Sequence, residues 1–233
     1  MKARYLLLSL LAATALPLAL GGTTQASIIS IGTSLNAGPI TLQSSGATPG
    51  PVTFNGAVGA YNLDTVSGVD LTAASLDSNS INATATGTFA ALHIFVSASD
   101  ITSFNGLVQA LSGLTVNFLS RGWTVTESTF EDNSNTVFGT TGPSVTLLAT
   151  HMFTSGPDIF TKTTSVDVTS PFSVTEEFTV KSNGFAGAAN NTIDLSGTVP
   201  ETSTWAMLVL GFMGLGYTAF RRSAKTRRAA TAI

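Results

Sequence analysis

Side chains that commonly carry out chemistry are scarce in this 233-residue sequence. It has two histidines, His93 and His151, and no cysteine, so disulfides, zinc–thiolate sites and thiol nucleophiles are excluded. There is no G-x-S-x-G, H-E-x-x-H or Walker-type motif, and a hydrolytic triad could be assembled only by free choice among many serines. We therefore expect a protein that is not an enzyme, with no cofactor and no bound metal.

Both histidines have an ordinary structural interpretation. His151 continues an alternating apolar row, so we expect a histidine in the core or at a sheet edge rather than a ligand. His93 lies between Leu92 and Ile94 and should point away from them. The row that His151 continues consists of Val145, Leu147, Ala149 and Phe153.

Carboxylates offer the remaining chemistry, because a glycosidase needs only two of them. Glu176 interrupts the apolar row of residues 172–181, and burial would raise its pKa unless a base such as Arg121 or Lys162 paired with it. We interpret Glu176 as an edge position near solvent. The oxygen-rich segment 131–136 could wrap a calcium ion, but it lacks the spacing of a known calcium loop, which favours a polar turn.

Threonines form short rows at every second residue. In a strand these hydroxyls would lie about 6.6 to 6.8 Å apart. Such rows occur on ice-binding and carbohydrate-contacting faces, although the plain interpretation is the solvent face of a sheet. The rows are Thr84, Thr86 and Thr88; Thr124 and Thr126; and Thr161 and Thr163.

The segment 27–199 alternates apolar and polar residues almost throughout, which is typical of half-buried strands. Turn pairs such as Asn55-Gly56 and Gly142-Pro143 separate the runs. We expect one all-β domain, an antiparallel β-sandwich that could take a jelly-roll form, with one short helix over 104–114. The predicted strands cover 28–31, 52–63, 80–89, 92–96, 115–119, 123–130, 145–153, 165–168, 172–181 and a last row at Ile193, Leu195 and Val199.

The body is acidic although the whole chain is close to neutral. Residues 27–199 contain twelve acidic and three basic residues, so their net charge is −9 against −3 for the chain. Nucleic-acid binding is disfavoured, because it needs clustered Lys and Arg. An acidic, weakly charged surface rich in Ser, Thr and Asn suits an extracellular matrix.

The N-terminus has the pattern of a secretory signal peptide. Lys2 and Arg4 precede an apolar run over residues 5–20, and small residues at Thr24 and Ala26 mark a cleavage site between Ala26 and Ser27. We therefore assign residues 1–26 to a signal helix that is removed on export. A retained N-terminal membrane helix is the alternative.

The C-terminus has a complementary pattern. Residues 205–220 carry no charge, and a cluster of basic residues follows. A helix of that length is about 24 Å long, and extension to 203–220 brings it close to the roughly 30 Å of a bilayer core. We predict a transmembrane helix with its basic end in the cytoplasm, which places the body outside the membrane. A buried core helix is the alternative. The basic residues are Arg221, Arg222, Lys225, Arg227 and Arg228.

About the last 35 residues resemble a known sorting signal. Pro200-Glu201, Trp205-Ala206, a Gly-interrupted apolar run and Arg221-Arg222 follow one another at the C-terminus. This order is similar to the PEP-CTERM signal of bacterial proteins, in its PEPxxWA version. The chain departs from that pattern at Thr202, where the family has proline.

The resemblance implies processing by an exosortase, a membrane-embedded cysteine transpeptidase. Pro200 and Glu201 would be the recognition dipeptide, Trp205 and Ala206 would begin the membrane anchor, and Arg221-Arg222 would stop translocation. The physical chemistry fits this division, since Pro200 keeps Val199 extended and accessible.

The first functional hypothesis is thus an exported surface or extracellular-matrix protein of residues 27–199, sorted by residues 200–233 from a membrane-anchored precursor. Its role would be structural or exopolysaccharide-associated. The alternatives are a carbohydrate-binding or ice-binding module, suggested by the threonine rows, and a secreted hydrolase, suggested by Glu176.

Overall fold

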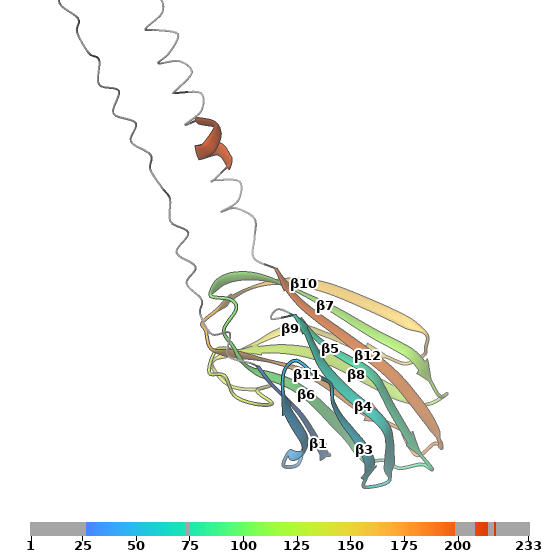
Figure 1. The fold of residues 1–233 in the computed structure, drawn as a ribbon. Coiled ribbons are helices and arrows are strands. Elements are labelled where there is room, and N and C mark those ends of the chain that lie inside the picture. Colours follow the sequence, from blue (N-terminus) through green and yellow to red (C-terminus); the bar gives the residue numbers. More distant parts are fainter. Residues whose placement is uncertain (1–26, 73–74, 199–207, 214–216, 218–233) are drawn as a thin grey trace, which may run out of the picture.

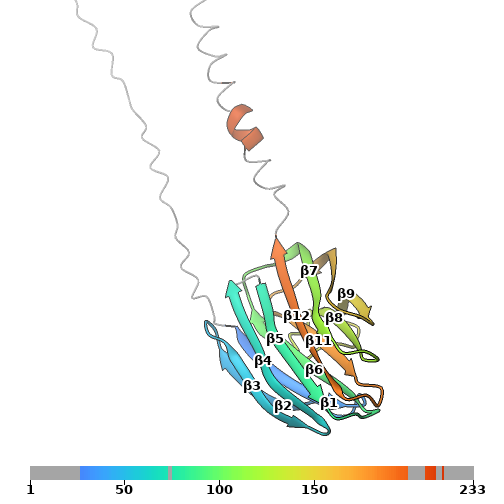
Figure 2. The same cartoon turned by 90° about the vertical axis from the view of Figure 1, so that its right-hand side faces the viewer.

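The computed structural model describes residues 27–72, 75–198, 208–213 and 217. Two antiparallel β-sheets pack face to face in it (Figures 1 and 2), so the predicted all-β antiparallel sandwich is confirmed. Sheet A contains, in spatial order, β2 (Thr41–Ala47), β1 (Ile28–Leu35), β6 (Ala91–Ile101), β11 (Phe172–Lys181), β8 (Thr124–Asp132) and β9 (Val145–Phe153). Sheet B contains β10 (Asp158–Val168), β7 (Gly106–Leu119), β12 (Gly187–Thr198), β5 (Ser75–Ala85), β4 (Tyr61–Thr72) and β3 (Val52–Val58).

The loops gather at two opposite ends, because neighbouring strands run antiparallel. β1 begins and β12 ends at the same end, where residues 27 and 198 lie (Figure 1); we call this end the base. The other end, which we call the tip, carries the connections 36–40, 59–60, 86–90, 120–123, 154–157 and 182–186.

The core consists of two apolar clusters between the sheets. The larger cluster includes Trp123, Tyr61 and Phe178 and extends to the tip. The smaller cluster lies toward the base and consists of Val108, Ala110, Leu148, Val166, Val168, Phe172 and Leu195. Inward side chains at every second position build both clusters, as the period-two pattern predicts.

The predicted helix over 104–114 is wrong. Gly106–Leu119 forms β7, which pairs with β10 on one side and β12 on the other. Along β7 the buried residues fall at every second position, Val108, Ala110, Ser112, Leu114 and Val116. The exposed Leu107 and Leu111 between them imitate a helical pattern. Pairing on both sides therefore overrides the local signal.

Two predicted strand faces shift because the strands are irregular. β5 ends at Ala85, and Gly87 with a φ of +121° turns the chain, so Phe89 lies outside the strand instead of in its apolar row. In β9 the register shifts opposite Thr129 and Phe130. Leu148 is consequently buried, and the predicted core residue Leu147 is exposed.

The terminal predictions fall almost wholly outside the described residues. This holds for Ala26, Pro200, Glu201, Trp205, Ala206, Arg221 and Arg222. Residues 208–213 and 217 are helical, but within the described residues no helix combines the length and apolar character that crossing a membrane requires. The signal helix and the transmembrane helix therefore stay predictions. Ser27 is described, and its Oγ lies 3.0 Å from Oγ1 of Thr48 at the base.

The closed core makes a testable prediction about stability. Phe178 is fully buried in the larger cluster, so we expect Phe178→Ala to lower the free energy of unfolding by about 3 to 5 kcal/mol. Ile159→Ala is the matched control, because Ile159 is 68% exposed on β10, and its effect should stay within about 0.5 kcal/mol. Urea unfolding measures both; equal effects of the two substitutions would contradict the sandwich.

Candidate functional site

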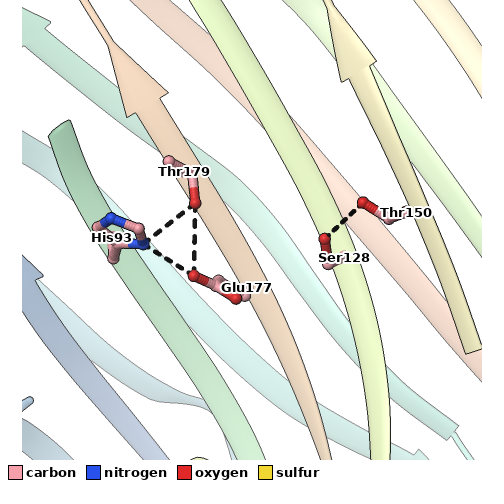
Figure 3. A network of polar contacts seen from close by, with 5 residues as sticks. All are labelled: His93, Ser128, Thr150, Glu177 and Thr179. Carbon is pink, nitrogen blue, oxygen red and sulfur yellow. Dashed lines mark hydrogen bonds and ion pairs between the residues drawn. The ribbon is translucent and has the colours of Figure 1, made fainter. Parts of the chain in front are cut away.

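A polar network lies on the outer face of sheet A (Figure 3). Nδ1 of His93, on β6, lies 2.8 Å from Oε1 of Glu177 and 3.1 Å from Oγ1 of Thr179, and both of these residues are on β11. Leu92 and Ile94 are fully buried on the opposite face. The prediction that His93 points away from its two neighbours is therefore confirmed.

The network orients the imidazole but assembles no nucleophile. Glu177 and Thr179 hold Nδ1, and the ring stacks on Phe95 at a centroid distance of 6.3 Å. Within the described residues no serine or threonine is hydrogen-bonded to Nε2 of His93. The nearby Ser128 and Thr150 pair with each other at 2.8 Å (Figure 3).

His151 is a packing residue at the sheet edge, as predicted. Its ring stacks on Phe160 of β10 at a centroid distance of 4.5 Å and an interplanar angle of 5°. It also meets Phe153 edge to face at 4.7 Å. Because β9 and β10 are edge strands of different sheets, these rings close the side of the sandwich.

Glu176 lies in the core, so its predicted position at an edge near solvent is wrong. It belongs to β11, which is flanked by β6 and β8 inside sheet A, and its side chain is fully buried. Ser78 Oγ, from β5 of the opposite sheet, donates a hydrogen bond to Oε2 of Glu176. Burial raises the pKa of Glu176 well above its usual value, and the negative charges of Asp77, Asp194 and Glu127 raise it further.

Glu127 is a second buried carboxyl group, which was not among the residues predicted from the sequence. Burial raises its pKa from 4.5 to about 8, and the backbone of Thr115 lowers it only partly. Neither carboxyl oxygen has a hydrogen-bond partner of ordinary geometry. Its signal in the sequence was its place in the inward row of Val125 and Thr129.

These carboxyl groups belong to a polar layer that interrupts the apolar core. Ser112 Oγ and Thr129 Oγ1 lie 2.7 Å apart across the two sheets. On β7, Ser112 falls between Ala110 of the smaller cluster and Leu114 of the larger one. The layer, which we call the core polar layer, consists of Ser78, Ser112, Glu127, Thr129 and Glu176.

The core polar layer does not have the form of a glycosidase site. Glu127 and Glu176 are both closed to solvent, so in this arrangement neither carboxyl group can contact a polymeric substrate. Within the described residues, no three His, Asp or Glu side chains converge to hold a metal ion.

The segment 131–136 folds as a polar turn in which the carboxylate of Asp132 finds its hydrogen-bond donors locally. Asp132 Oδ1 accepts hydrogen bonds from the backbone amide and hydroxyl of Ser134, at 2.8 and 2.7 Å, and Oδ2 accepts from the amide of Thr136 at 3.3 Å. Burial disfavours the charged form of Asp132. The hydrogen bonds from Ser134, Ser144 and Thr136 outweigh that effect and lower the pKa to about 2.

The threonine row 84–88 is not a flat array. Thr84 is the last threonine inside β5, which ends at Ala85, and the turn at Gly87 separates it from Thr88. Thr161 and Thr163 are exposed on the edge strand β10, as the plain interpretation of a solvent face expects.

Two exposed aromatic rings lie at the tip instead. Phe89 is 87% exposed and Phe185 is 58% exposed. Each ring packs against a glycine. A Cβ added at Gly184 would lie 2.7 Å from Cζ of Phe89, and a Cβ added at Gly122 would lie 2.7 Å from Cδ2 of Phe185. Both glycines have positive φ values, 82° and 85°. We call Phe89 and Phe185 the tip aromatic pair.

Hydrogen bonds tie the loops of the tip aromatic pair together. Trp123 Nε1 donates to the carbonyl of Phe185 at 3.0 Å, and Asn183 Nδ2 donates to the carbonyl of Gly122 at 2.8 Å. The carbonyl of Thr88 accepts from the hydroxyl of Ser182 at 2.6 Å. The rings are therefore presented on loops that are fixed before any ligand arrives.

A comparison of the chain with models of known protein families gave no match, and a comparison with curated proteins gave no significant match either.

The buried carboxyl groups predict an unusual dependence of stability on pH. Because folding raises the pKa of Glu127 from 4.5 to about 8, the folded state holds this proton more tightly than the unfolded state. The contribution of Glu127 to the free energy of unfolding is complete below about pH 4.5. It is lost as the pH rises toward 8, by about 1.4 kcal/mol per pH unit. Urea unfolding between pH 5 and 8 should show this decline.

Glu127→Gln should flatten that pH profile by about the same slope, because the amide does not ionise. Asp64→Asn removes an exposed acid and should leave the slope unchanged. Parallel profiles for the wild type and Glu127→Gln would contradict the prediction.

Proposed function

We propose that this protein is an exported bacterial surface or extracellular-matrix protein with a structural, non-catalytic role. The observation that carries the proposal is the C-terminal order of Pro200-Glu201, Trp205-Ala206, an apolar run and Arg221-Arg222. The N-terminal pattern of a signal peptide supports it. The precursor would be anchored in the membrane and then released to the cell surface or matrix.

The arrangement of the body is consistent with this route. β1 begins and β12 ends at the base (Figure 1), so a C-terminal anchor would hold the sandwich by its base and turn the tip outward. An exosortase-type enzyme would be the processing partner. The net charge of −9 over residues 27–199 speaks against nucleic acid as a ligand.

A second candidate function is carbohydrate binding, favoured by the tip aromatic pair. Exposed aromatic rings provide flat apolar surfaces on which the C–H faces of sugar rings can stack, and fixed loops lower the entropic cost of binding. Arg121 and Lys181, two of the three bases of the body, are exposed beside these loops. Anionic exopolysaccharide is therefore the ligand that this end suits best. Ice binding is less favoured, because the row 84–88 is broken.

Cell fractionation with intact-mass measurement tests the sorting proposal. We expect a surface or released form that has lost residues 1–26 and the C-terminal tail. Pro200→Ala combined with Glu201→Ala should accumulate as an uncleaved membrane-bound precursor, whereas Thr198→Ala, two residues away, should be processed normally. A cytoplasmic protein that keeps both ends would contradict the proposal.

A glycan array with acidic and neutral polysaccharides tests the binding function. Replacing both rings, in Phe89→Ala with Phe185→Ala, should weaken binding by about 5- to 150-fold, on the scale of 0.5 to 1.5 kcal/mol for each of the two aromatic contacts. Leu111→Ala is the control, because Leu111 is also exposed but lies in the middle of β7, away from the tip. Equal binding by the wild type, the double variant and the control variant, or no binding at all, would reject the tip as a sugar site.

A further inference from the structure

An apolar cavity lies between the two sheets at the base. Its volume is about 50 Å³, and it is partly open to solvent. Its walls come from both sheets and include Val108, Val166 and Leu148, while Phe104 from the loop between β6 and β7 also lines it. It occupies the smaller apolar cluster, so it is separate from the tip aromatic pair and from the His93 network.

One carboxyl group lines this cavity. Glu131 of β8 is only 1% exposed, and neither of its oxygens has a hydrogen-bond partner of ordinary geometry. Burial raises its pKa to about 7; the charge of Asp132 raises it further, whereas Thr146 nearby lowers it slightly. Leaving a buried acceptor unsatisfied costs about 1 to 3 kcal/mol, so Glu131 is a group that a ligand can satisfy.

The surroundings favour a cation as that ligand. Asp132, the next residue, is held in its charged form by its own turn, as its pKa of about 2 indicates. Within the described residues the only ion pair joins His93 and Glu177, so none of the described cations pairs with Glu131. A largely apolar pocket with a few polar groups is the usual form of a small-molecule site, and Ser75 and Ser196 line this one beside Glu131.

We propose that the cavity binds a small primary amine with an apolar tail, whose ammonium group pairs with Glu131 and whose alkyl chain lies between the sheets. The ammonium group supplies the donors that the carboxylate lacks, and the walls remove the chain from water. This inference does not depend on the proposed function.

The size of the cavity limits the ligand. An apolar cavity of about 150 Å³ holds benzene, so 50 Å³ encloses about two carbon atoms. A longer chain must extend through the open side at the base. Among linear amines, affinity should therefore rise over the first carbons and then level off.

Isothermal titration calorimetry of the purified full-length protein with n-butylamine at pH 8 tests the proposal. We expect saturable binding at one site, and weaker binding of n-butanol, which has a similar shape without the charge. Glu131→Gln should weaken butylamine binding by roughly 10- to 100-fold, the range for a hydrogen bond to a charged group. Ala110→Leu should abolish it by filling the cavity.

Asp167→Asn is the matched control. Asp167 is an exposed acid on β10 between Val166 and Val168, which line the cavity, so its removal changes the charge of the base without changing the pocket. Binding to Asp167→Asn should stay within about twofold of the wild type, since exposed charges contribute little. Equal binding of butanol and butylamine would overturn the proposal. So would an unchanged affinity in Glu131→Gln, or no saturable heat up to about 50 mM amine.

Discussion

The closure of sheet A over sheet B is the constraint on which the rest of the molecule depends. Each sheet has one apolar face that cannot be left in water, and each large side chain buried between them contributes roughly 1.5 to 3 kcal/mol. The same closure removes water from every inward polar group. It therefore both stabilises the clusters around Phe178 and Val108 and holds Glu127, Glu131 and Glu176 away from solvent.

The core polar layer shows that closing the two sheets also carries a free-energy cost, because it buries polar side chains. A buried carboxylate is far less stable than a buried carboxylic acid unless a cation pairs with it, and the three bases of the body are all exposed or partly exposed on its surface. Glu127, with a pKa of about 8, thus keeps its proton at neutral pH. Burial raises the pKa of Glu176 well above its usual value, and Ser78 satisfies one oxygen of Glu176. The layer also divides the core, and the smaller part at the base is where packing is incomplete.

Much of the fold follows from the sequence, and most of the site does not. Alternation predicts the sandwich because each strand has one inward face, and it places His93 correctly for the same reason. Alternation fails where strand pairing determines the structure. The spacing of Leu107 and Leu111 predicts a helix in the segment that forms β7, and a register shift in β9 buries Leu148 in place of Leu147. Strand order, and with it the fact that Glu176 lies inside a sheet, depends on contacts distant in sequence. The isolated pattern around Phe89 could not reveal that β5 stops four residues earlier.

The position of both ends of the described β-domain follows from topology alone. In the described region twelve strands follow one another, and each reverses the direction of the one before it. Because the number of strands is even, the chain returns to the end from which it started, so residue 198 lies at the base with residue 27. A change within the tip loops cannot alter this, because it leaves the number of strands unchanged. The fold thus separates the end that continues into the terminal segments from the end that exposes Phe89 and Phe185, and sequence variation at one end need not disturb the other.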